Sequence, residues 1–182
     1  MKKKVFFVVM LLISGCSSLL GQCIVSIDSV VLDGVVEAKE RDMYISRSGE
    51  GPVISMHISI TNNHPDPLII VNHDYELYCE YTHNGSLHKS LPLYLTINNE
   101  DHVYSIPPYG TYTESLSTPL FLSFEAIELD DVIIYDYTTN LREVLSSLRL
   151  VFNYYGKRYV SKNKPIIKKG DLFFLEWRVE NY

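Results

Sequence analysis

Hydrophobic and polar residues alternate with a period of two along several stretches of the chain. In the segment VISMHISIT, residues 53–61, isoleucine or methionine fills every second position, and serine or histidine separates them. The segment 75–82 alternates in the same way, and Asn84-Gly85 follows it. Period two is typical of strands with one buried face, and Asn-Gly supplies the positive φ angles of a tight hairpin turn. We therefore predict two strands here, with a hairpin after the second.

The returning strand of this hairpin is predicted over residues 87–97. Pro92 within it requires an edge position or a bulge, because proline cannot donate to the ladder. The strands at 53–61 and 68–71 are expected to pair or to cross between sheets. The polar segment 37–52 is too short to separate two cores, so we expect a long loop there. Further strands are predicted around residues 24–32, 68–71, 103–106, 111–116, 132–137, 148–154, 158–161 and 172–179.

One helix is predicted to interrupt the strands, near residues 140–148. Asn140 and Glu143 form a capping-box-like start. The apolar residues that follow are spaced for one helical face, which must be buried against the rest of a small domain. They are Leu141, Val144, Leu145 and Leu148.

About ten short strands with frequent turn signals indicate an antiparallel β-sandwich. The segments VISMHISITNN, SIPPYGTYTESLS and SLRLVFNYYGKRYVS resemble Ig-like domains of small Bacteroidetes lipoproteins. The resemblance covers most of residues 24–179 and implies an all-β, Ig-like sandwich. The Ig hallmark of two core cysteines around a tryptophan is missing, since Trp177 lies near the C-terminus. Such domains serve as adhesins, glycan-binding modules, inhibitors and assembly parts, so the fold selects no function.

The N-terminus has the pattern of an export signal. Three lysines precede an apolar run, residues 5–13, which is shorter than the roughly 20 residues of a membrane-spanning helix. Ile13-Ser14-Gly15-Cys16 resembles the bacterial lipobox, which implies diacylglycerol on Cys16. We expect a signal peptide over 1–15, the lipidated cysteine and a tether over 16–23, and one sandwich domain over 24–182. Ordinary cleavage near Gly21 or Gln22 is the alternative.

The expected address is the periplasmic face of the outer membrane. Ser17 stands where the enterobacterial sorting rule would have aspartate for the inner membrane, and no acidic stretch follows the cysteine. The formal net charge is −6 and becomes more negative once the three leading lysines are removed. A surface of this sign repels phosphates, so we expect no nucleic-acid partner.

The candidate chemistry is sparse. Cys23 and Cys79 form a candidate disulfide, since an exported protein meets an oxidising compartment; a buried, inert Cys79 is the alternative. The six histidines lack metal-site spacing. The acidic cluster is expected to be a solvated face rather than a Ca²⁺ site. It comprises Glu125, Glu128, Asp130 and Asp131. No nucleophile elbow or phosphate loop is present, so no catalytic residue, metal or cofactor is predicted.

Two groups of residues are candidates for binding. The chain has 14 tyrosines, which offer a rigid face and a polar tip. Tyr109 and Tyr155 flank turns and are expected to be exposed and to contact a ligand. A basic C-terminal group is expected to meet an anionic surface, or else to be solvated beside acidic strands. It consists of Lys162, Lys164, Lys168 and Lys169.

These features predict a noncatalytic envelope lipoprotein that holds a protein partner at the outer membrane. Its partners would be the membrane, through the lipid anchor, and an envelope protein. A glycan-binding module is the first alternative, and a small envelope hydrolase or hydrolase inhibitor is the second. A protein partner predicts a contiguous exposed apolar patch. A glycan predicts an exposed aromatic face beside Asn, Asp or Glu, and an enzyme predicts a deep pocket of paired titratable groups.

Overall fold

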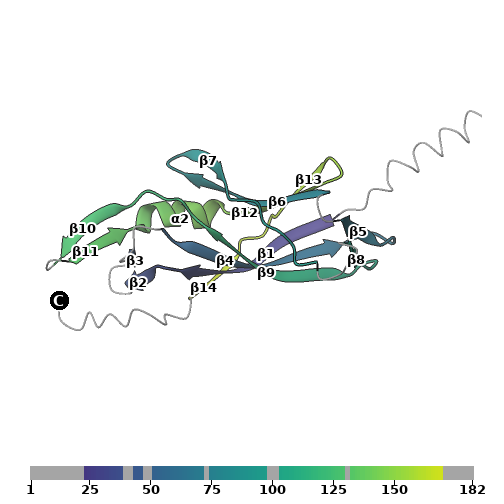
Figure 1. The fold of residues 1–182 in the computed structure, drawn as a ribbon, viewed down its shortest axis with the longest axis horizontal. Coiled ribbons are helices and arrows are strands. Elements are labelled where there is room, and N and C mark those ends of the chain that lie inside the picture. The colour runs from purple at the N-terminus through teal and green to yellow at the C-terminus, as the bar shows by residue number, and fades with distance from the viewer. Residues whose placement is uncertain are drawn as a thin grey trace, which may run out of the picture.

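A computed structural model describes residues 23–38, 43–46, 51–71, 74–97, 103–129 and 132–169. Two of its three four-stranded sheets form the main sandwich (Figure 1). The first sheet has the order β14-β1-β4-β9 and the second has the order β13-β12-β6-β7. The strands of the first are β14 (Ile166–Lys169), β1 (Cys23–Asp33), β4 (Val53–Asn62) and β9 (Thr111–Pro119). Those of the second are β13 (Lys157–Val160), β12 (Arg149–Tyr154), β6 (Tyr75–His83) and β7 (Ser86–Lys89).

This strand order is that of an Ig-like sandwich. Strands β1, β4 and β9 are adjacent and antiparallel, as strands A, B and E are in Ig domains. Strands β13, β12, β6 and β7 correspond to G, F, C and C′ of the other Ig sheet. The predicted all-β, Ig-like antiparallel sandwich with one short helix is therefore confirmed. Among the described strands one pair is parallel, that of β14 with β1.

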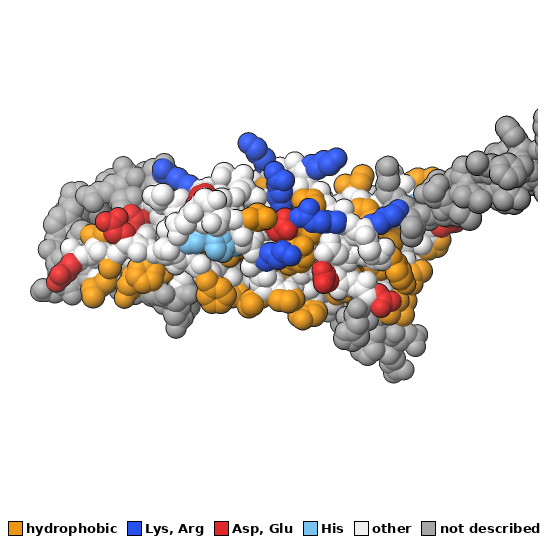
Figure 2. Space-filling view, turned by 90° about the horizontal axis from the view of Figure 1, so that it is seen from above, with side chains coloured by type: hydrophobic (Ala, Val, Ile, Leu, Met, Phe, Trp, Pro, Cys, Tyr) orange, Lys and Arg blue, Asp and Glu red, His pale blue; other side chains and the backbone are white. Residues whose placement is uncertain are grey.

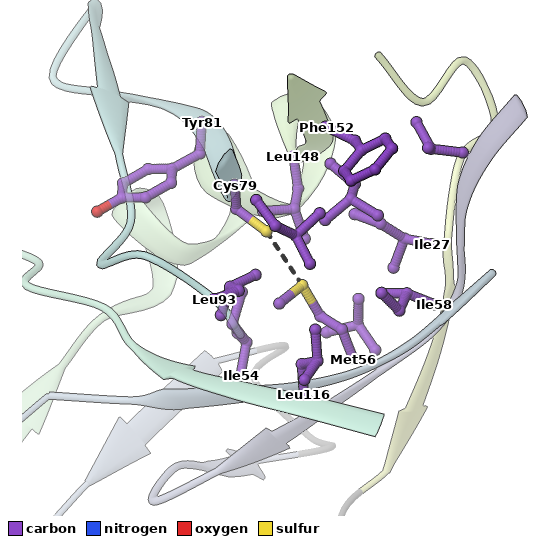
Figure 3. Close-up of a cluster of buried hydrophobic side chains, with 14 of the residues drawn as sticks. Ile27, Ile54, Met56, Ile58, Cys79, Tyr81, Leu93, Leu116, Leu148 and Phe152 are labelled. Carbon is purple, nitrogen blue, oxygen red and sulfur yellow. Dashed lines mark hydrogen bonds between the residues drawn. The ribbon is translucent and has the colours of Figure 1, made fainter. Parts of the chain in front are cut away.

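The core lies between the two sheets, where their apolar faces meet (Figure 3). The alternation predicted for residues 53–61 is observed, since β4 buries every second side chain completely. Met56 of β4 meets Cys79 of β6, with 3.2 Å between their sulfur atoms. Phe152 from β12 is also fully buried here. Burying one such side chain stabilises the fold by roughly 1.5–3 kcal/mol.

Two smaller sheets extend the sandwich at its ends. Strand β5 (Leu68–Val71) pairs with β8 (Val103–Ile106). Strand β5 therefore does not pair with β4 and belongs to a different sheet. The other small sheet has the order β10-β11-β3-β2. Its strands are β10 (Glu125–Leu129), β11 (Val132–Asp136), β3 (Met43–Ser46) and β2 (Val36–Ala38). The long loop predicted over 37–52 is thus wrong where β2 and β3 form.

Helix α2 (Thr138–Ser147), the one helix among the described residues, lies where a short helix was predicted and buries Leu141, Val144 and Leu145. Its predicted capping box is wrong, because the residue before the helix is Tyr137 and no side chain caps it. Glu143 instead accepts hydrogen bonds from the backbone N–H groups of Asn84 and Gly85, at 2.8 and 3.0 Å. The helix is therefore attached to the β6–β7 turn.

The β6–β7 turn is the predicted Asn-Gly hairpin, with φ of 52° at Asn84 and 70° at Gly85. The strand predicted to return over 87–97 is shorter than expected. Strand β7 ends at Lys89, and Leu93 then forms an isolated bridge to Leu77 of β6. Pro92 lies at this interruption, as its missing N–H requires. The strand predicted over 172–179 lies outside the described residues.

Candidate functional site

Tyr109 and Tyr155 lie at the same end of the sandwich as the start of β1. Cys23 is paired with Asn62 across β1 and β4, and the Asn62 N–H donates to the Gly110 carbonyl at 2.9 Å. Strand β12 reaches this end too, because the Tyr154 hydroxyl contacts the carbonyl of Ile69 on β5. We call this the tether end, since residues 16–22 precede it.

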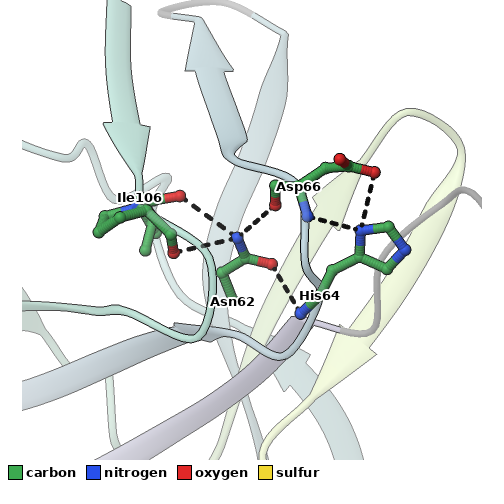
Figure 4. A network of polar contacts seen from close by, with 5 residues as sticks. Asn62, His64, Asp66 and Ile106 are labelled. Carbon is green, nitrogen blue, oxygen red and sulfur yellow. Dashed lines mark hydrogen bonds and ion pairs between the residues drawn. The ribbon is translucent and has the colours of Figure 1, made fainter.

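Asn62 holds the turns of the tether end together (Figure 4). It is 2% exposed, and its side-chain amide donates to the carbonyls of Asp66, Ile106 and Pro107 at 2.8, 3.3 and 3.2 Å. Its Oδ1 accepts the N–H of His64 at 3.1 Å. One buried amide thereby joins the β4–β5 turn to the β8–β9 turn that carries Tyr109.

Both predicted ligand tyrosines are exposed, at 66% for Tyr109 and 61% for Tyr155. Both also have positive φ, 58° and 45°. The left-handed region is unfavourable for a bulky residue, and such strain is found most often at functional positions. Turn geometry alone would favour Asn or Gly at these positions.

Tyr155 borders an open groove of about 490 Å³ beside the β12–β13 turn. Its polar lining residues include Asp74, Glu76, Asn153, Lys157 and Arg158. The Asn153 amide donates to Glu76 at 2.8 Å. The Asn153 Oδ1 is buried and makes no hydrogen bond among the described residues. We call this the Tyr155 groove.

The two cysteines of the predicted disulfide are buried free thiols in this structure. Cys23 is paired with Asn62, whereas Cys79 contacts Met56, six residues earlier in β4. Six residues of extended strand span roughly 20 Å, and cysteines whose Cα atoms lie more than about 7 Å apart cannot be bridged without backbone movement. Burial raises the pKa of each thiol to about 12. Cys16 lies outside the described residues.

The structure divides the four predicted lysines. Lys162 and Lys164 line a groove of about 650 Å³ between the end of α2 and the segment that joins β13 to β14. Arg142 and Arg149 line the same groove. Lys168 is exposed on β14, and the side chain of Lys169 lies outside the described residues. We call this cavity the basic groove.

Basic side chains gather on the face of the β13-β12-β6-β7 sheet (Figure 2). Near them, Glu80 is only 8% exposed, and the Nη2 of Arg158 donates a hydrogen bond to its Oε2 at 2.5 Å. This hydrogen bond raises the pKa of the Arg158 guanidinium, with a smaller contribution from Tyr78. Lys89 lies over the Tyr78 ring, 4.5 Å from its centre. Glu80 and Tyr78 are therefore covered by long cationic side chains.

Hydrophobic side chains form a row along one long edge of the molecule (Figure 2). Strands β7 and β9 are terminal in their sheets, and the segment after β9 reaches the β6–β7 turn, since the Ser123 N–H donates to His83 at 3.3 Å. The exposed apolar residues of these segments are Leu87, Leu91, Tyr94, Phe121 and Phe124. We call these five residues the apolar flank.

The remaining candidates are scattered. Glu125 and Glu128 are exposed on β10, while Asp130 and Asp131 lie outside the described residues. Across the described ranges, no cluster of three or more His, Cys, Asp or Glu side chains is arranged to hold a metal ion. No helix in the same part of the chain is long and apolar enough to span a membrane.

Sequence reasoning missed most residues of the two grooves and the apolar flank. Asp74, Asn153 and Arg149 carry no motif, and only the strand pairing brings them beside Tyr155 or the lysines. Strand β12 gives no alternation that would place Arg149, because Leu150, Val151 and Phe152 are all fully buried.

Comparisons with known proteins add little. No family model matches this chain, and no curated protein matches it. An uncharacterised β-sandwich protein from Clostridium difficile 630 aligns structurally with 79% of this chain and 90% of its own, at 15% sequence identity and a TM-score of 0.28. The assignment as a sandwich rests on the strand order of the present chain.

Proposed function

We propose that this chain is a noncatalytic cell-envelope lipoprotein that holds a protein partner at the outer membrane, and that the partner binds to the apolar flank. The observation that carries the proposal is the exposure of Leu87, Leu91 and Phe121, at 70%, 53% and 70%. Exposed apolar patches mark interaction surfaces in soluble domains. This is the pattern expected for a protein partner.

The lipid anchor on Cys16 fits the same proposal. Six residues, 17–22, separate Cys16 from Cys23, and the two Cα atoms can lie at most roughly 25 Å apart, so the tether end would stay close to the membrane. The apolar flank lies beside β7 and β9, the terminal strands of the two main sheets. A partner bound there would lie beside the domain, at the membrane surface.

A photo-crosslinking experiment in the native host tests this proposal. A benzoylphenylalanine at Leu91 or Phe121 should capture one reproducible protein. The same group at Thr113, which is exposed on β9 and is not part of the apolar flank, should not capture that protein. Leu91→Asp combined with Phe121→Asp should reduce copurification of that protein at least tenfold. Equal capture from Thr113 would contradict the proposal.

A glycan ligand is the second candidate, and the Tyr155 groove is the observation that favours it. An exposed ring lies there beside Glu76 and Asn153, which are suited to sugar hydroxyl groups. Binding on a glycan array that is lost with Tyr155→Ala and kept with Tyr94→Ala would select this function. Tyr94 is the matched control because it is exposed on the apolar flank, outside the groove.

A further inference from the structure

We propose that the basic groove binds a phosphate ester, as a ligand separate from the protein partner. Arg142, Arg149, Lys162 and Lys164 line the groove, and none of its described lining residues is acidic. Arg149, Lys162 and Lys164 form no ion pair with any described residue. Cations that share a groove without counter-charges repel one another, and an anionic ligand would relieve that repulsion.

The surrounding protein makes this cluster unusual. The chain has a formal net charge of −6. Strands β1, β4 and β9 contain no lysine or arginine. All lysines and arginines with described side chains lie on α2, on the β13-β12-β6-β7 sheet or on residues 161–169. Four of these eight cations line the basic groove.

The end of helix α2 does not account for the cations. A helix C-terminus carries about half a negative charge, which balances only a small part of the charge on Arg149, Lys162 and Lys164. No basic residue lies in the last turn of α2, where that interaction would be strongest. Most of the positive charge on these three side chains thus remains for a ligand.

A buried hydroxyl group adds a donor. Ser161 lines the groove and is 3% exposed. Its Oγ accepts the N–H of Leu150 at 2.9 Å, which leaves its own proton to donate. Guanidinium groups bind phosphate oxygens in pairs, and lysines supply further charge. This donor set suits a dianionic phosphate better than a single carboxylate.

Apolar residues line the groove as well. Leu145, Leu148, Val160 and Ile167 line it, so an uncharged part of the ligand would be desolvated beside the phosphate. The volume of about 650 Å³ lies within the range of roughly 300–1,000 Å³ for small-molecule sites. The ligand class is therefore a phosphate ester with an apolar portion, from either a lipid headgroup or a soluble metabolite.

Calorimetric titration of the whole protein in neutral detergent tests whether the basic groove binds such a phosphate ester. The probes are inorganic phosphate, glycerol 3-phosphate and a short-chain phosphatidic acid below its micellar concentration. We expect saturable binding to the wild-type protein. Arg149→Gln/Lys162→Gln should weaken it at least tenfold. The control Lys89→Gln/Lys168→Gln, which removes the same charge outside the groove, should weaken it less than twofold. Tighter binding of phosphatidic acid than of glycerol 3-phosphate would identify a lipid source, and equal binding a soluble one.

Three results would overturn the proposal. The first is the absence of saturable binding by all three probes, with unchanged circular dichroism showing that the protein is folded. The second is an equal loss of affinity in the two double variants, which would mean general charge attraction. The third is equally tight binding of a glutamate peptide. None of these bears on the apolar flank, whose partner is tested separately.

Discussion

Burial of single side chains determines which groups of this chain can react. Cys23 and Cys79 are both below 9% exposed, and burial raises the pKa of each thiol to about 12. Since the thiolate is the reactive form, both should be inert in the folded protein. Sequence reasoning correctly placed Cys79 on the inward face of its strand, but the Cys23–Cys79 bond that it considered is not formed in this structure.

Alkylation at pH 8 measures the reactivity of the two thiols directly. We expect neither thiol to react with iodoacetamide in the folded protein, and both to react in denaturant without a reductant. A reductant requirement in denaturant would show that the predicted bond forms in the exported protein.

The same thiols should make stability depend on alkaline pH. Their pKa is raised on folding, so their contribution is complete below about pH 9 and is lost as pH rises toward 12. The free energy of unfolding should fall by up to about 1.4 kcal/mol per pH unit for each thiol. Urea denaturation at several pH values from 8 to 11 should show that the free energy of unfolding falls less steeply with pH in Cys23→Ala/Cys79→Ala. An identical slope would contradict the assigned burial.

At the scale of elements, period-two alternation predicted the long strands well, and its absence explains the misses. Strands β2 and β3 have three and four residues, too few to show a period. Strand β14 reads IIKK, without alternation, and is specified by its pairing with β1. The capping-box prediction failed because Glu143 is used by the β6–β7 turn, a contact that local sequence does not reveal.

The connection between two turns gives a prediction at this scale. Replacing Asn62 with alanine would remove the donors to three carbonyls in the β4–β5 and β8–β9 turns. We expect the free energy of unfolding to fall by about 2–3 kcal/mol, since buried polar groups would lose their partners. Asn63→Ala, at the exposed neighbouring position, should change it by less than about 0.5 kcal/mol. Urea denaturation of both variants measures the difference.

At the scale of the whole molecule, the three candidate surfaces are assembled from distant segments. Leu87 and Phe121 read like core residues in the sequence, because a pattern of apolar residues does not distinguish a sheet edge from the interior. The basic groove likewise combines residues 142–149 with 160–167. Only strand order brings these segments together, so the sequence indicated parts of each surface and not the whole.

The proposed location at the outer membrane depends on lipidation of Cys16. Intact-mass analysis of protein extracted from host membranes should give a chain that begins at Cys16 and carries diacylglycerol. Cys16→Ser should abolish the lipid and release the domain from the membrane fraction. A mature chain that begins at Gln22 or Cys23 would contradict the lipid anchor.

The parallel pairing of β1 with β14 also affects the timing of folding. Ser29 at the start of the domain pairs with Ile166 near its end, and contacts of such sequence separation slow folding. For the exported chain proposed above, the first strand would emerge from the membrane long before the strand that completes its sheet. If the chain is exported as proposed, this pairing would delay closure of the sandwich until most of the domain has crossed the membrane, so the chain would stay unfolded during translocation.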